Sequence, residues 1–544
     1  MSKDLCWLQC PRNGRYNKMR GEYPNDVIQC IVDELMARPD VSTGEMYALT
    51  HGLAHHDPSD PDSNLRVTYP PDRIVWIRNS VRPIADILED IRHYLVLFPT
   101  AKVGLRLSQR VDVTDTELAQ LGLLVYDLTL IQCQRINIAN AVVSEPDYRL
   151  RRLALHDCDN VRYSCHLRHL HALEIIGCQK IRDVRALGSV PTLTLRYLPR
   201  VTNVSTLGTV HTLDLSNCDN VADVSALGGV DTLTLRNCGV IDVSALGGVH
   251  TLDISGTPVQ DVSALGGVHT LRMTHTRFVN DFRALGGVHT LDASSTNITY
   301  LNALGSVHTL ILQGCNGIRD VSPLANVHTL DLYSCYNAHN FGTLSGVHTL
   351  SLGRCAVTNA DLSALARGTV HALNVSGCDE ITDVSMLGGI HTLNLSACTD
   401  VTDVRALGGV HTLDLSYCED ITDVSMLGGV HTLSLRHTGV TDVSALGRVH
   451  TLDLSDCDGV RNVSMLGRVH TLNLSYCARV RNVNALGGVH TLNLSGCGRV
   501  TDVTALATVH KLILGHGNIE DVYGRPIHVV GLDTLRNIEW SSVP

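Results

Sequence analysis

The stretch "GGVHTLDLSYCEDITDVSMLGGVHT", residues 408–432, ends on the same letters with which it begins. Aligning this motif along the 544 residues gives eighteen units between His171 and the last start at His510, nearly all 19 or 20 residues long. Three looser copies start at Val103, Tyr126 and Arg151. A fixed period of this length is the signature of a solenoid, in which each repeat contacts only its neighbours.

The consensus V-H-T-L-x-L-S-x-C-x-x-V/I-T-D-V-S-A-L-G-G predicts a short strand and a tight return. We count its histidine as position 1. In the L-x-L segment alternate residues face opposite sides, so Leu213 and Leu215 are expected to point inward and Asp214 outward. Such a strand is stable only beside its copies, in a parallel sheet over a shared apolar interior. In the return, Asp223 is expected to cap a 3₁₀ turn, and the glycines at 228–229 to supply a permissive backbone.

This spacing resembles the leucine-rich repeat, L-x-x-L-x-L-x-x-N/C-x-L, and its return resembles the short, internalin-like branch. The resemblance implies an α/β solenoid, a horseshoe with a parallel concave β-sheet and short 3₁₀ or turn returns on the convex side. It also implies a protein partner on the concave face. We expect an N-terminal, mainly helical cap or F-box-like domain (1–102), degenerate leading repeats (103–170), regular repeats (171–529) and a C-terminal cap (530–544).

Fourteen of the eighteen cysteines fall at position 8. This regular pitch predicts a buried structural ladder, because zinc sites and disulfides need paired spacing. So many free thiols are typical of a reducing compartment, which predicts a cytoplasmic or intracellular protein that is not secreted. The ladder comprises Cys133, Cys158, Cys178, Cys218, Cys238, Cys315, Cys335, Cys355, Cys378, Cys398, Cys418, Cys457, Cys477 and Cys497.

Histidine opens sixteen of the eighteen units. The simplest interpretation is structural: each histidine forms a hydrogen bond to the backbone of the neighbouring repeat, and duplication of the repeat copies it. A pH-sensitive column and a metal-binding column remain alternatives, because imidazole titrates near neutral pH and is a common metal ligand.

Positions that vary between units are the candidates for partner binding on the concave face. Position 4 supplies an acidic stripe of Asp214, Asp253, Asp292, Asp331, Asp414 and Asp453, interspersed with Asn374, Asn394, Asn473 and Asn493. Positions 6 and 7 supply Arg196, Arg236, Arg436, Tyr197, Tyr333, Tyr417 and Tyr476. Arginine and tyrosine are enriched in interface hot spots, so these are the expected anchors; the polar residues could equally keep an exposed sheet soluble.

The segment "YPNDVIQCIVDELMARPD", residues 23–40, has apolar residues at helical spacing. It resembles the opening of an F-box, which would bind a Skp-type adaptor of a cullin ubiquitin ligase. The resemblance assigns adaptor binding to Pro24, Val27, Ile28, Ile31 and Leu35. The alternative is a simple cap over the first repeat. A zinc site at Cys6, Cys10, His51 and His55 is a further, weaker pattern.

Charge, apolar runs and motif content argue against several classes of function. The net charge of −11 argues against a nucleic-acid partner, and no apolar run is long enough for a membrane span. No nucleophile elbow, phosphate loop or metalloprotease motif is evident, so we expect a non-catalytic protein without cofactor or metal. The prediction is an interaction scaffold; the alternatives are a substrate receptor of a ubiquitin ligase and a structural component of a larger assembly such as a virion.

Overall fold

The computed structural model describes residues 74–78, 82–138, 148–162, 167–515 and 538–540. The predicted adaptor-binding helix and the candidate zinc ligands at Cys6, Cys10, His51 and His55 lie outside these ranges. The chain divides into two compact units, residues 1–250 and 251–544, which we call unit 1 and unit 2 and describe separately.

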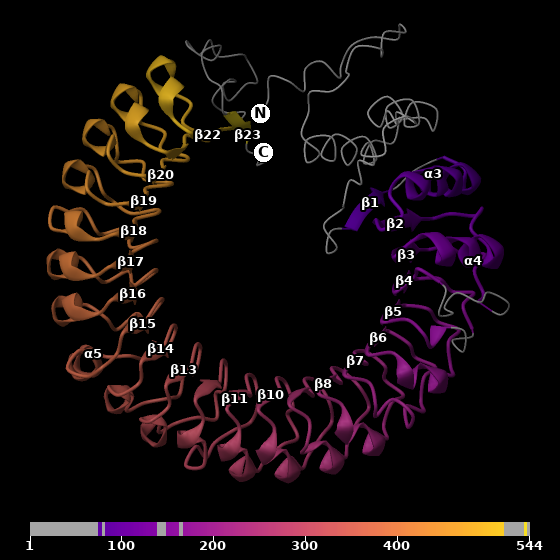
Figure 1. The fold of residues 1–544 in the computed structure, drawn as a ribbon. Coiled ribbons are helices and arrows are strands. Elements are labelled where there is room, and N and C mark those ends of the chain that lie inside the picture. Colours follow the sequence, from indigo (N-terminus) through magenta and orange to yellow (C-terminus); the bar gives the residue numbers. More distant parts are fainter. Residues whose placement is uncertain (1–73, 79–81, 139–147, 163–166, 516–537, 541–544) are drawn as a thin grey trace, which may run out of the picture. The chain divides into compact units, whose positions relative to one another are not determined.

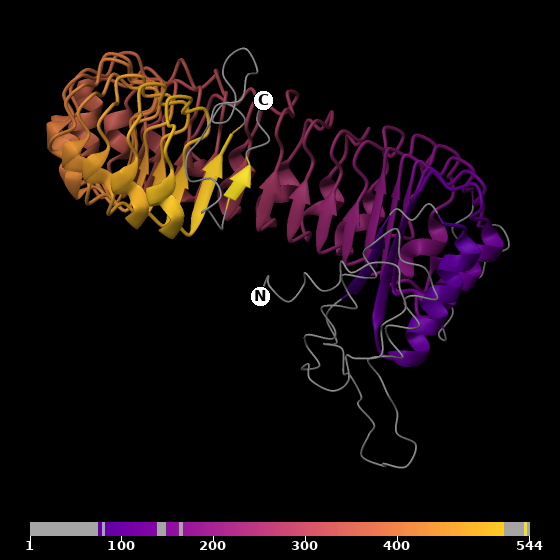
Figure 2. The same cartoon turned by 90° about the horizontal axis from the view of Figure 1, so that it is seen from above.

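Unit 1 is built on parallel strands that pair in sequence order (Figures 1 and 2). The register keeps equivalent positions opposite one another, as in the Leu193–Leu213 pair. The strands are β1 (Ile74–Arg78), β2 (Lys102–Ser108), β3 (Asp127–Ile131), β4 (Arg152–His156), β5 (Ala172–Ile176), β6 (Thr192–Arg196), β7 (Thr212–Asp214) and β8 (Thr232–Thr234). Within the described residues, β1 is the first strand of the ladder, and it lies in the segment expected to form the cap.

The first returns of unit 1 are helices, because their connections are longer than those of the consensus. They are α3 (Ile84–Leu97) and α4 (Asp115–Leu124), and Thr114 with Glu117 forms a capping box at the start of α4. Later returns shorten to the 3₁₀ segments η3 (Arg185–Ser189), η4 (Ser225–Gly229) and η5 (Ser244–Leu246). Among the helices in the described ranges, none is long and apolar enough to cross a bilayer.

Unit 2 repeats the same arrangement with shorter strands, which lie on the inner side of its arc with the 3₁₀ segments outside (Figure 1). Its strands are β9 (Thr251–Asp253), β10 (Thr270–Arg272), β11 (Thr290–Asp292), β12 (Thr309–Ile311), β13 (Thr329–Asp331), β14 (Thr349–Ser351), β15 (Ala372–Asn374), β16 (Thr392–Asn394), β17 (Thr412–Asp414), β18 (Thr432–Ser434), β19 (Thr451–Asp453), β20 (Thr471–Asn473), β21 (Thr491–Asn493), β22 (Lys511–Leu514) and β23 (Ile538–Trp540).

Its returns are 3₁₀ segments except for one helix, α5 (Asn359–Leu365), in a repeat lengthened by three residues. They are η6 (Ser263–Gly267), η7 (Arg283–Gly287), η8 (Leu304–Ser306), η9 (Ser322–Leu324), η10 (Phe341–Leu344), η11 (Ser385–Gly389), η12 (Arg405–Gly409), η13 (Leu427–Gly429), η14 (Ser444–Leu446), η15 (Ser464–Leu466), η16 (Asn484–Gly488) and η17 (Thr504–Thr508).

The interior of each unit is a set of identical columns. Leu213 and Leu215 are fully buried, as the L-x-L pattern predicted, and so is Leu227 from the return. Asp223 accepts a hydrogen bond from the backbone N–H of Ser225 at 3.0 Å, at the start of η4. The strand, the return and its acidic cap are therefore confirmed.

The prediction that the paired glycines supply a permissive backbone for the turn was wrong. Gly228 does not have a positive φ; instead a Cβ there would lie 2.3 Å from the carbonyl oxygen of Ala245 in the next return. The glycine provides room for adjacent returns to approach, rather than freedom to turn. The left-handed backbone occurs at position 7, for example at Tyr417 with φ 62°.

The cysteine ladder is confirmed as structural. All fourteen of its thiols are buried and free of disulfides. The Cys418 thiol donates to the carbonyl oxygen of Leu395 in the preceding repeat at 3.3 Å, and burial raises its pKa to about 12. Where threonine replaces cysteine, as at Thr438, the hydroxyl donates within its own repeat, to the carbonyl oxygen of Leu435 at 2.7 Å.

Candidate functional site

The candidate site is the open face of each sheet, which we define by the side chains at positions 2, 4 and 6. Strand alternation places these side chains opposite the buried leucines. In β17, for example, Thr412 and Asp414 are half-buried on this face while Leu413 lies in the core. This is the surface that the resemblance predicted to be concave and partner-binding.

The acids and asparagines of position 4 all have a structural task. In every one of the ten predicted stripe residues, a side-chain oxygen accepts the backbone N–H two residues later, as Asp414 does from Ser416 at 2.9 Å. This turn is a known preference of Asp and Asn. Asp214 and Asp253 are only 8% exposed. The stripe therefore shapes the end of each strand, whatever else it binds.

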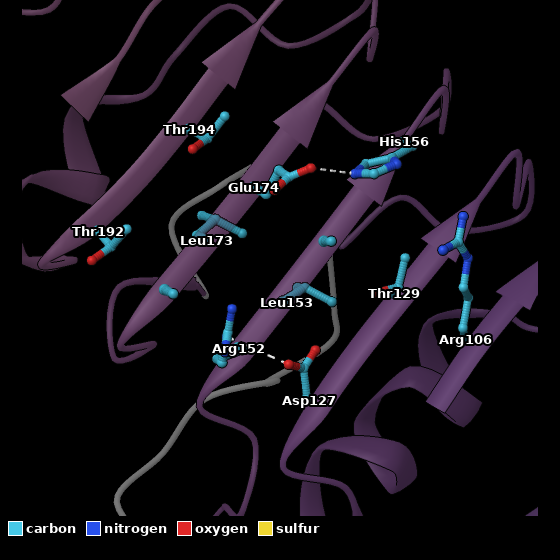
Figure 3. Close-up of a pocket in the computed structure, with 12 residues that line it drawn as sticks. Arg106, Asp127, Thr129, Arg152, Leu153, His156, Leu173, Glu174, Thr192 and Thr194 are labelled. Carbon is cyan, nitrogen blue, oxygen red and sulfur yellow. Dashed lines mark hydrogen bonds and ion pairs between the residues drawn. The ribbon is translucent and has the colours of Figure 1, made fainter. Parts of the chain in front are cut away.

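A pocket of about 410 Å³ lies on the open face of unit 1 (Figure 3). Five charged or titratable side chains line it, from strands β2 to β5, at positions 2, 4 and 6. They are Arg106, Asp127, Arg152, His156 and Glu174. The five lie on the three looser copies and the first regular repeat, and the three at positions 2 and 6 replace the Thr and Ser of the consensus.

A hydrogen bond and an ion pair organise this pocket. His156 Nε2 lies 2.6 Å from Glu174 Oε1, and this hydrogen bond lowers the pKa of Glu174 (Figure 3). Arg152 Nε lies 3.4 Å from Asp127 Oδ2. Burial nevertheless raises the pKa of Asp127, which is 7% exposed. Arg106 is exposed and makes no ion pair within the described residues, so its charge is available to a ligand.

Sequence reasoning missed these five residues because it concentrated on the regular repeats. The signal was present: charged residues at positions 2, 4 and 6 of the three looser copies and of the first regular one. The residues it did select lie one strand further on. Arg196 Nε donates to Asp214 Oδ2 at 2.7 Å, which raises the pKa of Arg196, and Tyr197 is 53% exposed at the left-handed position 7.

Unit 2 has a second, shallower pocket of about 490 Å³, lined in part by the predicted residues Asp292 and Tyr333. Gln313 Nε2 donates to Asp331 Oδ2 at 2.7 Å on the same surface. The guanidinium of Arg354 lies 6.0 Å from the centre of the Tyr333 ring, a cation–π contact. Predicted residues from adjacent strands are thus brought together here.

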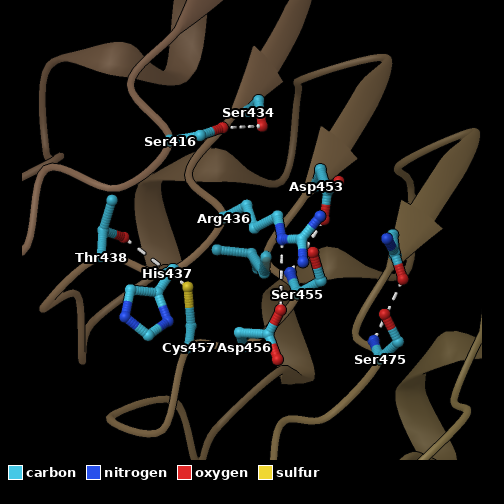
Figure 4. A network of polar contacts seen from close by, with 12 residues as sticks. Ser416, Ser434, Arg436, His437, Thr438, Asp453, Ser455, Asp456, Cys457 and Ser475 are labelled. Atoms are coloured by element: carbon cyan, nitrogen blue, oxygen red, sulfur yellow. Dashed lines mark hydrogen bonds and ion pairs between the residues drawn. The ribbon is translucent and has the colours of Figure 1, made fainter. Parts of the chain in front are cut away.

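A further polar cluster surrounds Arg436 (Figure 4). Its Nε donates to Asp456 Oδ2 at 3.2 Å, and its Cζ lies 5.4 Å from the centre of the Tyr417 ring. Tyr417 also packs against His437, with ring centres 5.5 Å apart. The predicted pair Arg436 and Tyr417 is therefore in contact, at the edge where the strands end.

Two further predicted anchors are Tyr476 and Arg236. Tyr476 is 46% exposed, with its ring close over Gly496, where a Cβ would lie 2.6 Å from a ring carbon. Arg236 lies at position 6 of the repeat that follows Asp214. Within the described residues, no group of three or more His, Cys, Asp or Glu side chains is placed to hold a metal ion.

The repeat sequence, the in-register parallel ladder and the 3₁₀ returns define a leucine-rich-repeat fold with short units. No family model matches the chain, and neither does any curated protein.

Among solved structures, the chain is similar to the functional domain of InlJ from Listeria monocytogenes, at 16% identity over 58% of this chain and 71% of that one, with a TM-score of 0.39. It is also similar to the internalin InlF of that organism (19%, covering 69% and 98%, TM-score 0.31). A leucine-rich-repeat protein of Leptospira interrogans matches at 15%, covering 72% and 89%, with a TM-score of 0.36. The class assignment rests on the repeats and the ladder, not on these values.

Proposed function

We propose that the chain is a non-catalytic scaffold that binds a protein partner on the open face of its sheets. The observation that carries this is the pocket of unit 1, where five charged or titratable side chains at positions 2, 4 and 6 converge on one surface. Side chains that differ from the repeat pattern are not required to form the solenoid. They are therefore free to take part in recognition of a partner.

The chemistry of the face suits a polar protein surface. The Arg152–Asp127 ion pair and the His156–Glu174 hydrogen bond hold these side chains in place, and Arg106 adds a cation that has no ion-pair partner among the described residues. Charge complementarity of this kind favours specificity and the rate of association. The Arg436–Tyr417 contact adds residue types that dominate interface hot spots.

A charge-reversal comparison tests the proposal. Arg106→Glu changes the pocket, whereas Arg200→Glu makes the same change at an exposed arginine outside the open face. Partners captured by the full chain are identified by quantitative mass spectrometry. We expect Arg106→Glu to reduce recovery of a defined partner about tenfold, and Arg200→Glu to leave it unchanged. Equal recovery with both variants would contradict the proposal.

A further inference from the structure

A second surface of unit 2 is a continuous column of imidazole rings. Thirteen histidines at position 1, from His269 to His510, lie in consecutive repeats. Each ring stacks on the next, with centroids 4.4–5.0 Å apart and planes within 8–27° of parallel. Each histidine directly precedes the first residue of a strand, so the column follows the edge where the strands begin, outside the open face.

The backbone and one ring nitrogen hold each imidazole in place. The N–H groups of His411 and Thr412 both donate to the carbonyl oxygen of His391, at 3.0 Å. His411 Nδ1 lies 3.3 Å from the Thr412 hydroxyl, and eleven of the thirteen rings make this contact. From His289 to His490, Nε2 has no hydrogen-bond partner within the part of the chain that the structure describes.

The charges near the column are all positive. The residues two before each histidine are Gly, Ser, Asn or Thr, except for Arg448 and Arg468. The residue after each histidine is Thr, apart from Ala372 and Lys511. No Asp or Glu occurs in the column or in either flanking row; the acids of unit 2 lie at other positions of the repeat. When the rings protonate, no neighbouring carboxylate neutralises them.

For four rings of the column, only the geometry of the column itself opposes protonation. Shielding from water and then repulsion between adjacent imidazoles lower the pKa of His308, His391, His431 and His470. No carboxylate contributes to the shift in any of the four. These four rings therefore resist protonation more than a free imidazole does, because they are shielded from water and because adjacent charged rings repel one another. A ligand that supplies negative charge would promote this protonation.

We propose that the histidine column is a binding site for a linear polyanion bearing phosphate or sulfate groups, and that it binds when the pH falls below neutrality. The rings span about 55 Å, at about the spacing of parallel strands. Protonating alternate rings would place cations about 9 Å apart along the curved edge of the sheet, with Arg448, Arg468 and Lys511 as permanent charges at one end. Each imidazolium would donate its outward Nε2–H to the ligand.

The geometry favours an anion over a metal ion. Because the rings are nearly parallel, the Nε2 lone pairs of neighbours point in the same direction and do not converge on a shared ion. A linear anion needs no convergence, since each cation contacts a different group of the ligand. Binding then follows the electrostatics of any polyelectrolyte and weakens with salt.

The test compares the full chain with two triple variants, using fluorescently labelled inorganic polyphosphate and, separately, heparin at low salt. The column variant carries His391→Gln, His411→Gln and His431→Gln. The control carries His275→Gln, His339→Gln and His437→Gln, three histidines of unit 2 that lie outside the column. Circular dichroism at each pH verifies that all three proteins are folded.

We expect at least one of the two probes to bind the unmodified chain at least about tenfold more tightly at about pH 5.5 than at about pH 7.5. The column variant should lose about fivefold or more of the affinity at the lower pH, and the control none. Calorimetry in two buffers should show proton uptake on binding. Binding of polyphosphate alone or of heparin alone would identify the anionic group.

Three results would overturn the proposal. The first is that neither probe binds at the lower pH. The second is an affinity that does not change with pH. The third is an equal loss in the column variant and the control, which would show that general positive charge, not the column, attracts the anion. Because the column lies outside the open face, these outcomes are independent of the partner-binding proposal.

Discussion

At the scale of single residues, position 7 holds the backbone in the left-handed region whichever residue occupies it. Ala397 has φ 59°, Tyr417 has φ 62°, and Gly377 has φ 61°. This region is unfavourable for L-residues by about 1 kcal/mol. The left-handed conformation is maintained because the backbone N–H at position 7 joins adjacent repeats. The N–H of Ala397 donates to the carbonyl oxygen of Ser416, and the N–H of Tyr417 donates to that of Arg436, both at 2.8 Å.

Replacing a non-glycine residue at position 7 by glycine should therefore stabilise the protein. For Ala397→Gly, we expect a gain of about 0.5–1 kcal/mol in the free energy of unfolding, since the exposed methyl group makes little contact and the left-handed strain is removed. Ala406→Gly, at an exposed position in η12, is the matched control and should lose about the same amount. Chemical denaturation measures both; a loss at Ala397 would refute the strain argument.

The turn formed by position 4 makes a second prediction at this scale. Asp414→Ala removes the acceptor for the Ser416 N–H and should lower the free energy of unfolding by about 1 kcal/mol. Asp414→Asn keeps an acceptor oxygen, as Asn394 does in the preceding repeat, and should be close to neutral. If urea denaturation showed the same loss of unfolding free energy in both variants, the charge rather than the turn would be the stabilising feature.

At the scale of the element, the return is limited by the space between successive copies. Gly408 lies where a Cβ would be 2.3 Å from the carbonyl oxygen of Met426 in the next return. Gly389, at the second glycine position of another return, has no atom within 4 Å of such a Cβ. The two glycines share a sequence context but differ in the neighbour that each faces.

Alanine substitutions should separate the two glycines. Gly408→Ala must push adjacent returns apart and should cost about 1–3 kcal/mol of stability. Gly389→Ala meets nothing and should be neutral or stabilising by about 0.5 kcal/mol, because alanine restricts the unfolded chain. Thermal melts of the two variants test this, and equal destabilisation would mean that backbone freedom, not space, explains the glycine pair.

At the scale of the whole molecule, stability is a sum of repeats and of contacts between neighbours. Leu413 is almost fully buried in β17 and pairs in register with Leu393 and Leu433 on the adjacent strands. Within the described residues of unit 2, the strands pair only with those of the adjacent repeats. A defect should therefore spread only a short distance along the ladder.

Leu413→Ala should show this directly. The cavity should cost about 2–4 kcal/mol locally. Hydrogen exchange followed by mass spectrometry should show lost protection in β16, β17 and β18, with protection retained in β3 to β5 of unit 1. The conservative variant Leu413→Met should leave exchange nearly unchanged. Uniform loss of protection in both units would instead mean that the chain unfolds as one cooperative body.

The sequence by itself determined the repeat, the inward leucines, the cysteine ladder and the acidic cap of the return. Each of these depends on residues close together in one repeat and is then copied, so the period alone reveals it. The structure decided three other features: the use of position 4 in a turn, the need for space at Gly408 and the charged pocket around Glu174.

The turn at position 4 joins residues only two positions apart, such as Asp414 and Ser416. The other two features join residues about twenty positions apart, and strand register decides which of their atoms meet. The same holds for the histidine column. The sequence showed a histidine in nearly every repeat, but only the in-register ladder brings rings such as His391 and His411 to a centroid distance of 4.6 Å. Local pattern therefore determines the fold, and the packing of one repeat on the next determines its surfaces.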